Sequence, residues 1–331
     1  GVFAAGVLQL ALLMWGMKRA GLSLRLRRPK WTDDLRRLWK LGIPGIVSGG
    51  VTQLNIAIGT MIATMQPGAV SQLYYADRLY ELPLAIVGIA VGVVLLPDVA
   101  RQLRAGNVDG VMDSQNRSLE FAMLLTIPAA LALAIIPNEI VRVLFERGAF
   151  MAADTLATAS VLSVFAVGLP AFVLIKVFSP AYFAREDTKT PMRYAAISLT
   201  ANTIGSIVLF FVFRSMGWMP QLGIAVATTL GGWLNAYLLW TTLKARGMFI
   251  VDARLRRNLP LIALASVAMG IALYWASGTF ATLLHSGRGV LVDMMALGLL
   301  VLFGMVVFAV MILGAGVMSP AQFKRFTRRR S

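Results

Sequence analysis

Long apolar stretches alternate with short polar segments along this chain of 331 residues. A helix needs about 20 mostly apolar residues to cross the hydrocarbon core of a bilayer. Stretches of about that length recur along the whole chain, and the connections between them are polar. The pattern predicts an all-α polytopic membrane protein with nine spans, at residues 1–17, 41–65, 72–98, 118–137, 154–178, 192–213, 221–243, 258–277 and 289–313.

Composition supports this class and excludes several kinds of chemistry. The chain is 58% hydrophobic and 14% charged, whereas soluble domains are about 25% charged. It contains no cysteine and one histidine, His285, so disulfides, thiol catalysis and Cys/His zinc sites are excluded. The motifs of phosphate-binding loops, zinc proteases and serine hydrolases are also missing. We therefore expect a protein without catalytic residues or a metal site, and not an enzyme.

The basic residues predict the orientation in the membrane. The formal net charge is +16, and 25 of the 31 lysines and arginines fall in alternate connections. The positive-inside rule assigns these connections, and with them the C-terminus, to the cytoplasm. Because the charges lie between apolar spans, we expect anionic lipid headgroups as partners and no nucleic acid. The basic connections are residues 18–40, 101–117, 185–193, 244–257 and 324–330.

The stretch from Ser71 to Val99 carries charges inside an apolar span. Asp77 and Glu81 share one face of the predicted helix, with Arg78 beside them and Tyr74 one turn earlier. A charge at such a depth costs about 3 kcal/mol on insertion scales, so it normally faces a partner or a wet interior. Two interpretations follow: an ion pair that only joins helices, or a substrate-facing cation held by carboxylates.

Two further cations lie near the cytoplasmic side. Lys176 is within the fifth span, where it could bind an anionic headgroup, pair with a carboxylate such as Glu81, or extend its amine to the interface. Arg185 lies where an inward-facing cavity would open and could bind phosphate, or it is an ordinary positive-inside charge. Neutral oxygen-bearing residues in other spans could form a weak cation site but more often join helices by hydrogen bonds; they are Asn55, Asn202, Ser206 and Thr228.

Some shorter segments also have interpretable patterns. Asn138–Ala149 is amphipathic, and we expect it to lie on the outer membrane surface. Glycines around Pro44 predict that the second span bends. Several aspartates at helix ends are expected to cap them; these are Asp98, Asp109, Asp113, Asp187 and Asp252.

Three motifs in this order give the chain a recognisable family character: YYADRLYELPLAIVGIAVGVVLLP, LFERGAF and SPAYFAREDTKTP. Together they resemble the MurJ family, bacterial lipid II flippases of the multidrug/oligosaccharidyl-lipid/polysaccharide (MOP) exporter superfamily. The resemblance extends over essentially the whole chain. Family members have fourteen transmembrane helices, so the nine predicted here would be the sixth to the fourteenth. We therefore expect this chain to be the C-terminal part of a longer protein.

The resemblance implies a domain organisation. Residues 1–17 would end the sixth helix of a first lobe, and residues 18–40 would form a basic cytoplasmic linker with an amphipathic helix. Residues 41–248 would be a second six-helix lobe, and residues 249–316 two helices that form a groove for the lipid tail. Residues 317–331 would be a basic cytoplasmic tail.

The implied function is to flip undecaprenyl-linked lipid II from the inner to the outer leaflet of the bacterial inner membrane by alternating access. Arg78, Lys176 and Arg185 would bind its diphosphate, and Asp77, Glu81 and Tyr74 would support Arg78. Some relatives have a sodium site built with acidic residues. Because Asn55 and Ser206 stand here where carboxylates are expected, we predict membrane potential as the driving force, with no cofactor and sodium only as a weaker alternative.

Alternative functions remain open at this point. The runner-up is another MOP-type exporter, for a polysaccharide lipid or for drugs, although a drug antiporter would favour an acidic cavity. An integral-membrane enzyme of envelope lipid synthesis is a further alternative. We expect the transporter to be monomeric.

Overall fold

The computed structural model describes residues 2–21, 56–284 and 289–317, together with Thr32, Leu35, Arg36 and Trp39. This part of the chain is helical, and a helix lies in each predicted span that falls within it; residues 56–63 continue the second span. Asn55, His285 and the glycines around Pro44 lie outside the described residues. The helices are α1 (Val2–Arg19), α3 (Ala69–Arg104), α4 (Val108–Ile135), α5 (Pro137–Phe145), α6 (Ala152–Phe183), α7 (Lys189–Ser215), α8 (Pro220–Ala245), α9 (Ala253–Leu284) and α10 (Val290–Gly314).

The chain divides into two compact units, Gly1–Ile46 and Val47–Ser331. The first contains α1, an apolar helix whose last turn carries Lys18 and Arg19. Among the described residues of the second unit, six helices are long and apolar enough to cross a membrane: α4, α6, α7, α8, α9 and α10. The predicted all-α polytopic membrane fold is therefore confirmed.

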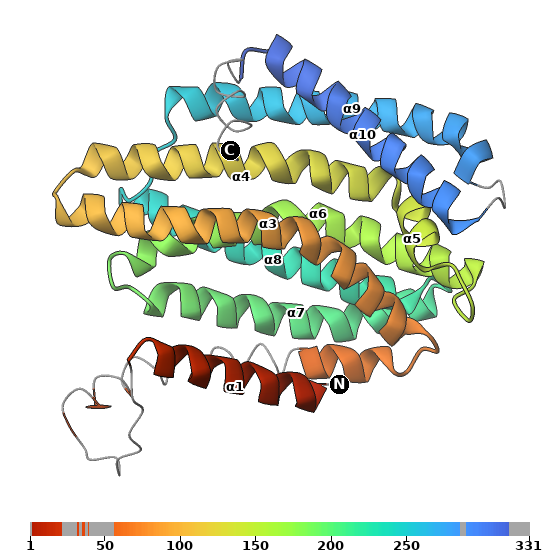
Figure 1. Cartoon of the computed structure of the whole chain (residues 1–331), viewed down its shortest axis with the longest axis horizontal. Helices are drawn as coiled ribbons and strands as arrows, with labels where there is room; N and C mark the ends of the chain where they lie inside the picture. Colours follow the sequence, from red (N-terminus) through yellow and green to blue (C-terminus); the bar gives the residue numbers. More distant parts are fainter. Residues whose placement is uncertain are drawn as a thin grey trace. The chain divides into compact units, whose positions relative to one another are not determined.

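Helix α6 lies at the centre of the second unit (Figure 1). It packs against α3, α4, α5 and α8. A helix surrounded in this way must be apolar on all sides, and Leu162, Leu169 and Val173 are fully buried. Hydrogen bonds also join α6 to α8, from Thr229 Oγ1 to the Val164 carbonyl at 3.0 Å and from Tyr182 Oη to the Leu239 carbonyl at 2.7 Å.

Helices α7 and α8 form a hairpin with a direct backbone contact. A Cβ atom placed on Gly223 of α8 would lie 2.5 Å from the carbonyl carbon of Leu209 and 2.7 Å from the nitrogen of Phe210. Real Cβ atoms do not approach backbone so closely, so glycine is required at this crossing. Small residues at membrane helix interfaces allow such approach and the van der Waals contact that follows from it.

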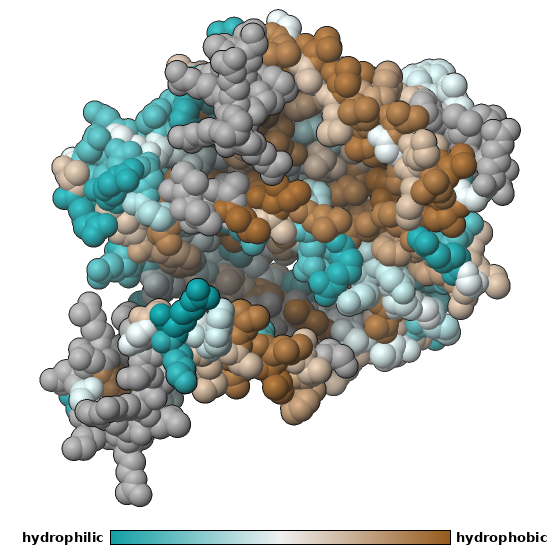
Figure 2. Space-filling view, viewed as in Figure 1, coloured by the Kyte–Doolittle hydropathy of each residue, from teal (hydrophilic) through white to brown (hydrophobic). Residues whose placement is uncertain are grey.

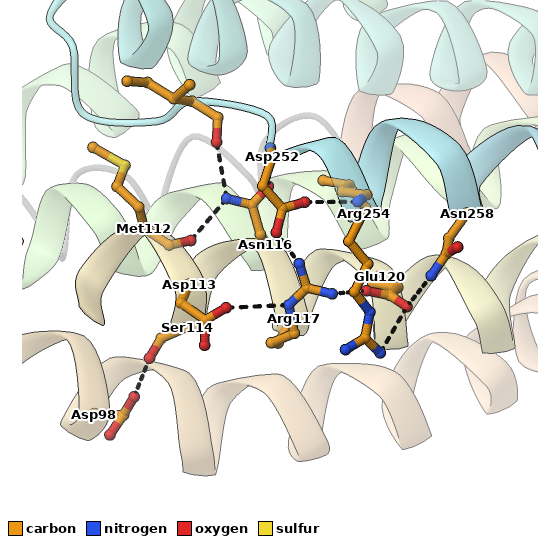
Figure 3. Close-up of polar contacts among 12 residues, drawn as sticks. Asp98, Met112, Asp113, Ser114, Asn116, Arg117, Glu120, Asp252, Arg254 and Asn258 are labelled. Carbon is orange, nitrogen blue, oxygen red and sulfur yellow. Dashed lines mark hydrogen bonds and ion pairs between the residues drawn. The ribbon is translucent and has the colours of Figure 1, made fainter. Parts of the chain in front are cut away.

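A polar network joins α4 to α9 at the end of the bundle where α4 begins (Figure 3). The carboxylate of Glu120, which is 9% exposed, contacts Arg117 of its own helix and, on α9, Arg254 at 3.3 Å and Asn258 at 2.7 Å. Arg117 also pairs with Asp252. Nearby, Asn116 donates to the Ile250 carbonyl at 2.8 Å and accepts from the Asp252 amide at 3.1 Å. These contacts attach the beginning of α9 to α4.

Apolar side chains cover much of the outer surface of α9 and α10 (Figure 2). Leu291 is 73% exposed and Trp275 is also 73% exposed. Soluble proteins rarely expose apolar patches of this kind. The exposed faces are suited to contact with lipid.

Helix α5 forms within the amphipathic segment that begins at Asn138 and was expected on the outer membrane surface. It packs against α6, and Val141 is fully buried in the core. Tyr75 of α3 meets Phe145 at the end of α5, with ring centroids 4.7 Å apart. The apolar face of α5 therefore packs against other helices of the protein.

The turn between α6 and α7 is held by Asp187, one of the aspartates expected to cap a helix. Its carboxylate accepts from the Thr190 amide at 3.0 Å and from the Thr190 hydroxyl at 2.7 Å, and it pairs with Arg246 at the end of α8 at 2.8 Å. Partial burial works against ionisation, but the hydrogen bonds from Thr190 and Arg246 outweigh it and keep the pKa of Asp187 below its ordinary 3.8. Asp252 likewise accepts from the Leu255 amide at 2.6 Å in the first turn of α9, so the expected cap is confirmed at both positions.

The α7–α8 contact predicts a large effect of one methyl group. Gly223→Ala should lower the free energy of unfolding by about 2 kcal/mol, because the backbone of α7 must move away. Thermal unfolding of the purified protein in detergent measures this loss. Gly298→Ala is the matched control, since a Cβ there meets nothing within 4 Å; equal unfolding temperatures for the two variants would contradict the prediction.

The α4–α9 network predicts that Glu120→Ala lowers the free energy of unfolding by about 2 kcal/mol, because Arg254 and Asn258 lose a charged partner. Protease cleavage between α8 and α9 should become faster as α9 detaches from α4. Asp113→Ala removes a carboxylate that pairs with Arg117 of the same network, but one that is 72% exposed, so its effect should be small. If the two variants were cleaved alike, the network would not be what holds α9.

The Asp187 contacts predict a pH dependence. Because the folded-state pKa lies below the ordinary value, the stabilisation is fully present above about pH 4 and is lost as the pH falls through the folded pKa. Asp187→Asn should therefore reduce the unfolding temperature at pH 7 and flatten its decline in acid. Glu186→Gln, an exposed change in the same turn, should leave both unchanged. An acid profile of Asp187→Asn identical to that of the unsubstituted protein would count against this assignment.

Candidate functional site

The charged group on α3 is built around Arg78. Its guanidinium pairs with Glu81 at 2.8 Å, one turn along the helix, and lies over the Tyr74 ring, 4.8 Å from the centroid. The side chains of Arg78 and Glu81 are 55% and 46% exposed. The arginine is therefore held by a carboxylate and an aromatic face while much of it stays accessible.

Asp77 behaves differently from Glu81. It is half-buried and forms neither a hydrogen bond nor an ion pair within the described part of the chain. Of the two carboxylates expected to hold Arg78, only Glu81 does so by direct contact.

Lys176 of α6 reaches across to α3 at Gly88. A Cβ atom on Gly88 would lie 2.9 Å from Lys176 Cδ and 3.4 Å from its Nζ, so the lysine stem occupies the space that the glycine leaves. Lys176 is exposed and has no ion-pair partner among the described residues. The alternative that Lys176 pairs with Glu81 is wrong, because Glu81 binds Arg78 and lies seven residues, about two helical turns, from Gly88.

A cavity of about 560 Å³ adjoins Lys176. Helices α3, α6, α7 and α8 contribute to its wall, with the Phe172 ring and the adjacent Gly231 and Gly232 on its apolar side. The side chains that bring nitrogen or oxygen to the lining are Lys176, Ser198, Asn202, Thr228 and Asn235. Two candidate residues of the weak cation site therefore share one cavity with the lysine.

These neutral residues interact with one another across α7 and α8. The side-chain oxygen of Asn202, Oδ1, accepts hydrogen bonds from Ser206 Oγ at 3.1 Å and from Thr228 Oγ1 at 3.4 Å. Three of the four predicted members are thus brought together, and the fourth, Asn55, lies outside the described residues. Within the described ranges no group of three or more acidic or histidine side chains could hold a metal ion. The arrangement is a hydrogen-bonded helix contact built from neutral oxygens.

Two polar residues of the cavity were not singled out from the sequence, Ser198 and Asn235. The signal was available in the spacing. Ser198 precedes Asn202 and Ser206 by successive steps of four on α7, and Asn235 follows Thr228 by seven on α8. Steps of four and seven place residues on one helix face. The polar stripe therefore continues further along both helices than expected.

Arg185 follows the end of α6 and is half-buried. Its Nη1 donates to the Ala181 carbonyl at 2.7 Å, and burial without a carboxylate partner lowers the pKa of the guanidinium below its ordinary value. Guanidinium groups nevertheless remain charged at any physiological pH. Arg185 is thus a cation that still has donors to offer an anion.

The three predicted cations do not form one cluster. Arg78 and Gly88, beside which Lys176 lies, are ten residues apart on α3, which is about 15 Å along a helix. Arg185 is nine residues beyond Lys176, or about 13 Å further. The structure therefore distributes the cations along the α3–α6 contact (Figure 1) instead of gathering them around one anion.

Comparison with known proteins agrees with this architecture. Residues 1–294 match the family model described as lipid II flippase MurJ. A probable lipid II flippase MurJ from Rhizobium tropici is 44% identical over 99% of this chain and 61% of its own length. The chain thus spans about three fifths of that relative.

Solved structures share the fold. A lipid II flippase MurJ in an inward closed conformation superposes with a TM-score of 0.67 at 23% identity, over 91% of this chain and 58% of that one. A MOP superfamily transporter from Pyrococcus furiosus gives 0.52 at 17% identity, over 84% of this chain and 64% of that one. With its sequence matched along most of its length, the chain belongs to the MurJ family of lipid II flippases.

Proposed function

We propose that this chain forms the larger part of a transporter that moves lipid II from the inner to the outer leaflet of the bacterial inner membrane by alternating access. Family membership supports the substrate, and this family consists of transporters, not enzymes. The observation that carries the proposal is the accessible guanidinium of Arg78, fixed by Glu81 and Tyr74 within a helix that is otherwise largely apolar. Such a cation is suited to bind a diphosphate.

The spacing of the cations suggests how they act. Since Arg78, Lys176 and Arg185 lie about 13 to 15 Å apart along the helices, one diphosphate meets them in succession. Arg185, at the end of α6, meets the headgroup as it enters from the cytoplasm. Lys176 and then Arg78 lie progressively nearer the outer end. The lipid tail stays in the membrane or against α9 and α10.

The driving force in this proposal is the membrane potential. Moving one elementary charge across the membrane changes its free energy by about 2.3 kcal/mol for each 100 mV of potential. Sodium is the weaker alternative, because the Asn202 oxygen already accepts two hydrogen bonds and Ser206 supplies no charge.

The setting of the transporter completes the proposal. The C-terminus and the segment 18–40 face the cytoplasm, where the basic connections contact anionic lipids. The second lobe comprises residues 41–248, and α9 and α10 belong to the tail-binding pair of residues 249–316. The transporter acts as a monomer.

Arg78→Ala is expected to abolish lipid II flipping in the full-length protein, because it removes a side chain that binds phosphate. It should leave membrane insertion intact, because it breaks no buried contact. Complementation of cells depleted of their own flippase, together with a vesicle assay on labelled lipid II, measures this. Normal growth with the variant would contradict the role.

Arg101→Ala is the matched control. Arg101 lies on the same helix, also pairs with a carboxylate three residues away, and is 74% exposed. Its loss should leave flipping unchanged. Analysis of the lipid after the assay distinguishes a flippase from an envelope enzyme, because a flippase returns lipid II chemically unaltered.

A further inference from the structure

The cavity beside Lys176 contains polar atoms that the protein itself does not satisfy. Ser198 is 5% exposed, and its Oγ has no hydrogen-bond partner in the described part of the chain. The Asn235 side-chain oxygen is also buried without a partner among those residues. Leaving such a group unpaired costs about 1 to 3 kcal/mol. Both residues also line the cavity, so hydrogen-bonding capacity that the protein leaves unused lies next to it.

The lining defines the chemistry of a suitable occupant. Among the described residues that line the cavity there is no carboxylate, and the hydrogen-bonding groups are hydroxyls and amides with one cation, Lys176. Neutral hydroxyl and amide groups can each donate and accept. This set suits a ligand rich in hydroxyls and amides and does not suit a bare inorganic cation.

The apolar side of the cavity suits a ring. A Cβ atom on Gly232 would lie 2.9 Å from the Phe172 ring, so glycine gives this ring room against α8. A ring that lines a cavity together with small residues can accept the less polar face of a sugar. The volume of about 560 Å³ lies within the range of small-molecule sites.

We propose that this cavity binds a sugar of the lipid-linked headgroup, with Ser198 and Asn235 bonded to its hydroxyl or acylamino groups. Lys176 lies at the cavity wall and binds the acidic part of the headgroup that adjoins this sugar. The inference rests on the proposed function, and it assigns recognition of the sugar to a place about 15 Å from Arg78 along α3. The diphosphate and the sugar are then recognised by different residues.

The test compares two lipids that differ only in the sugar-bearing part. Lipid II and undecaprenyl diphosphate are titrated against the full-length protein in detergent, unsubstituted and as Ser198→Ala, Asn235→Ala and Arg78→Ala. Each cavity variant should weaken lipid II binding about fivefold, as expected for one lost hydrogen bond, and leave undecaprenyl diphosphate binding unchanged. Arg78→Ala should weaken binding of both lipids.

Thr200→Ala is the matched control for Ser198→Ala. Thr200 lies on the same helix, is exposed, and its hydroxyl bonds only to the Ala196 carbonyl of its own helix. It should bind both lipids as the unsubstituted protein does. Thermal unfolding of each variant identifies any loss of lipid affinity that is caused by misfolding. The comparison uses whichever of Ser198→Ala and Asn235→Ala keeps the unfolding temperature of the unsubstituted protein.

The outcomes separate the two proposals. If the cavity variants bind both lipids unchanged, or lose affinity for both equally, the sugar site is overturned. If Arg78→Ala binds and flips lipid II normally, the proposed role of Arg78 fails, whereas the selective loss in the cavity variants would still support the sugar site.

Discussion

A charged side chain within an apolar helix bundle must have a partner or reach water, and this constraint governs the second unit of the chain. At about 3 kcal/mol for each unpaired charge, several would exceed the stability of a typical domain. The structure meets the constraint in three ways. Arg78 combines a carboxylate and an aromatic ring with exposure. Lys176 extends along the space left by Gly88 beside a polar cavity. Arg117 and Arg254 share the carboxylate of Glu120.

These three solutions have different consequences. The Glu120 network is nearly closed, because each buried charge meets another charge or an amide, and it therefore joins helices. Arg78 and Lys176 keep hydrogen-bonding capacity that the protein does not use. The structural and the functional charges thus differ both in the number of partners and in burial, since Glu120 is more buried than Arg78 or Lys176.

Much of the fold could be predicted from hydrophobic length alone, because a helix is the only way for a single segment to satisfy its backbone in lipid. The i, i+3 spacing likewise predicted the contact of Arg78 with Glu81. What could not be predicted were relations between helices. The contact of Lys176 with Gly88 joins residues 88 positions apart, the Asp252–Arg117 pair joins residues 135 apart, and α5 packs into the core against a different helix. Periodicity within one helix carries no information about such contacts.

The crossing at Gly223 limits which parts of the unit can shift during a transport cycle. Where two helices touch main chain to main chain, no side-chain rotamer is available to absorb sliding, so α7 and α8 behave as one rigid lever. The cavity that these two helices share with α3 and α6 therefore has one wall whose helices keep a fixed spacing. A crosslink between α7 and α8 would leave the shape of that wall unchanged.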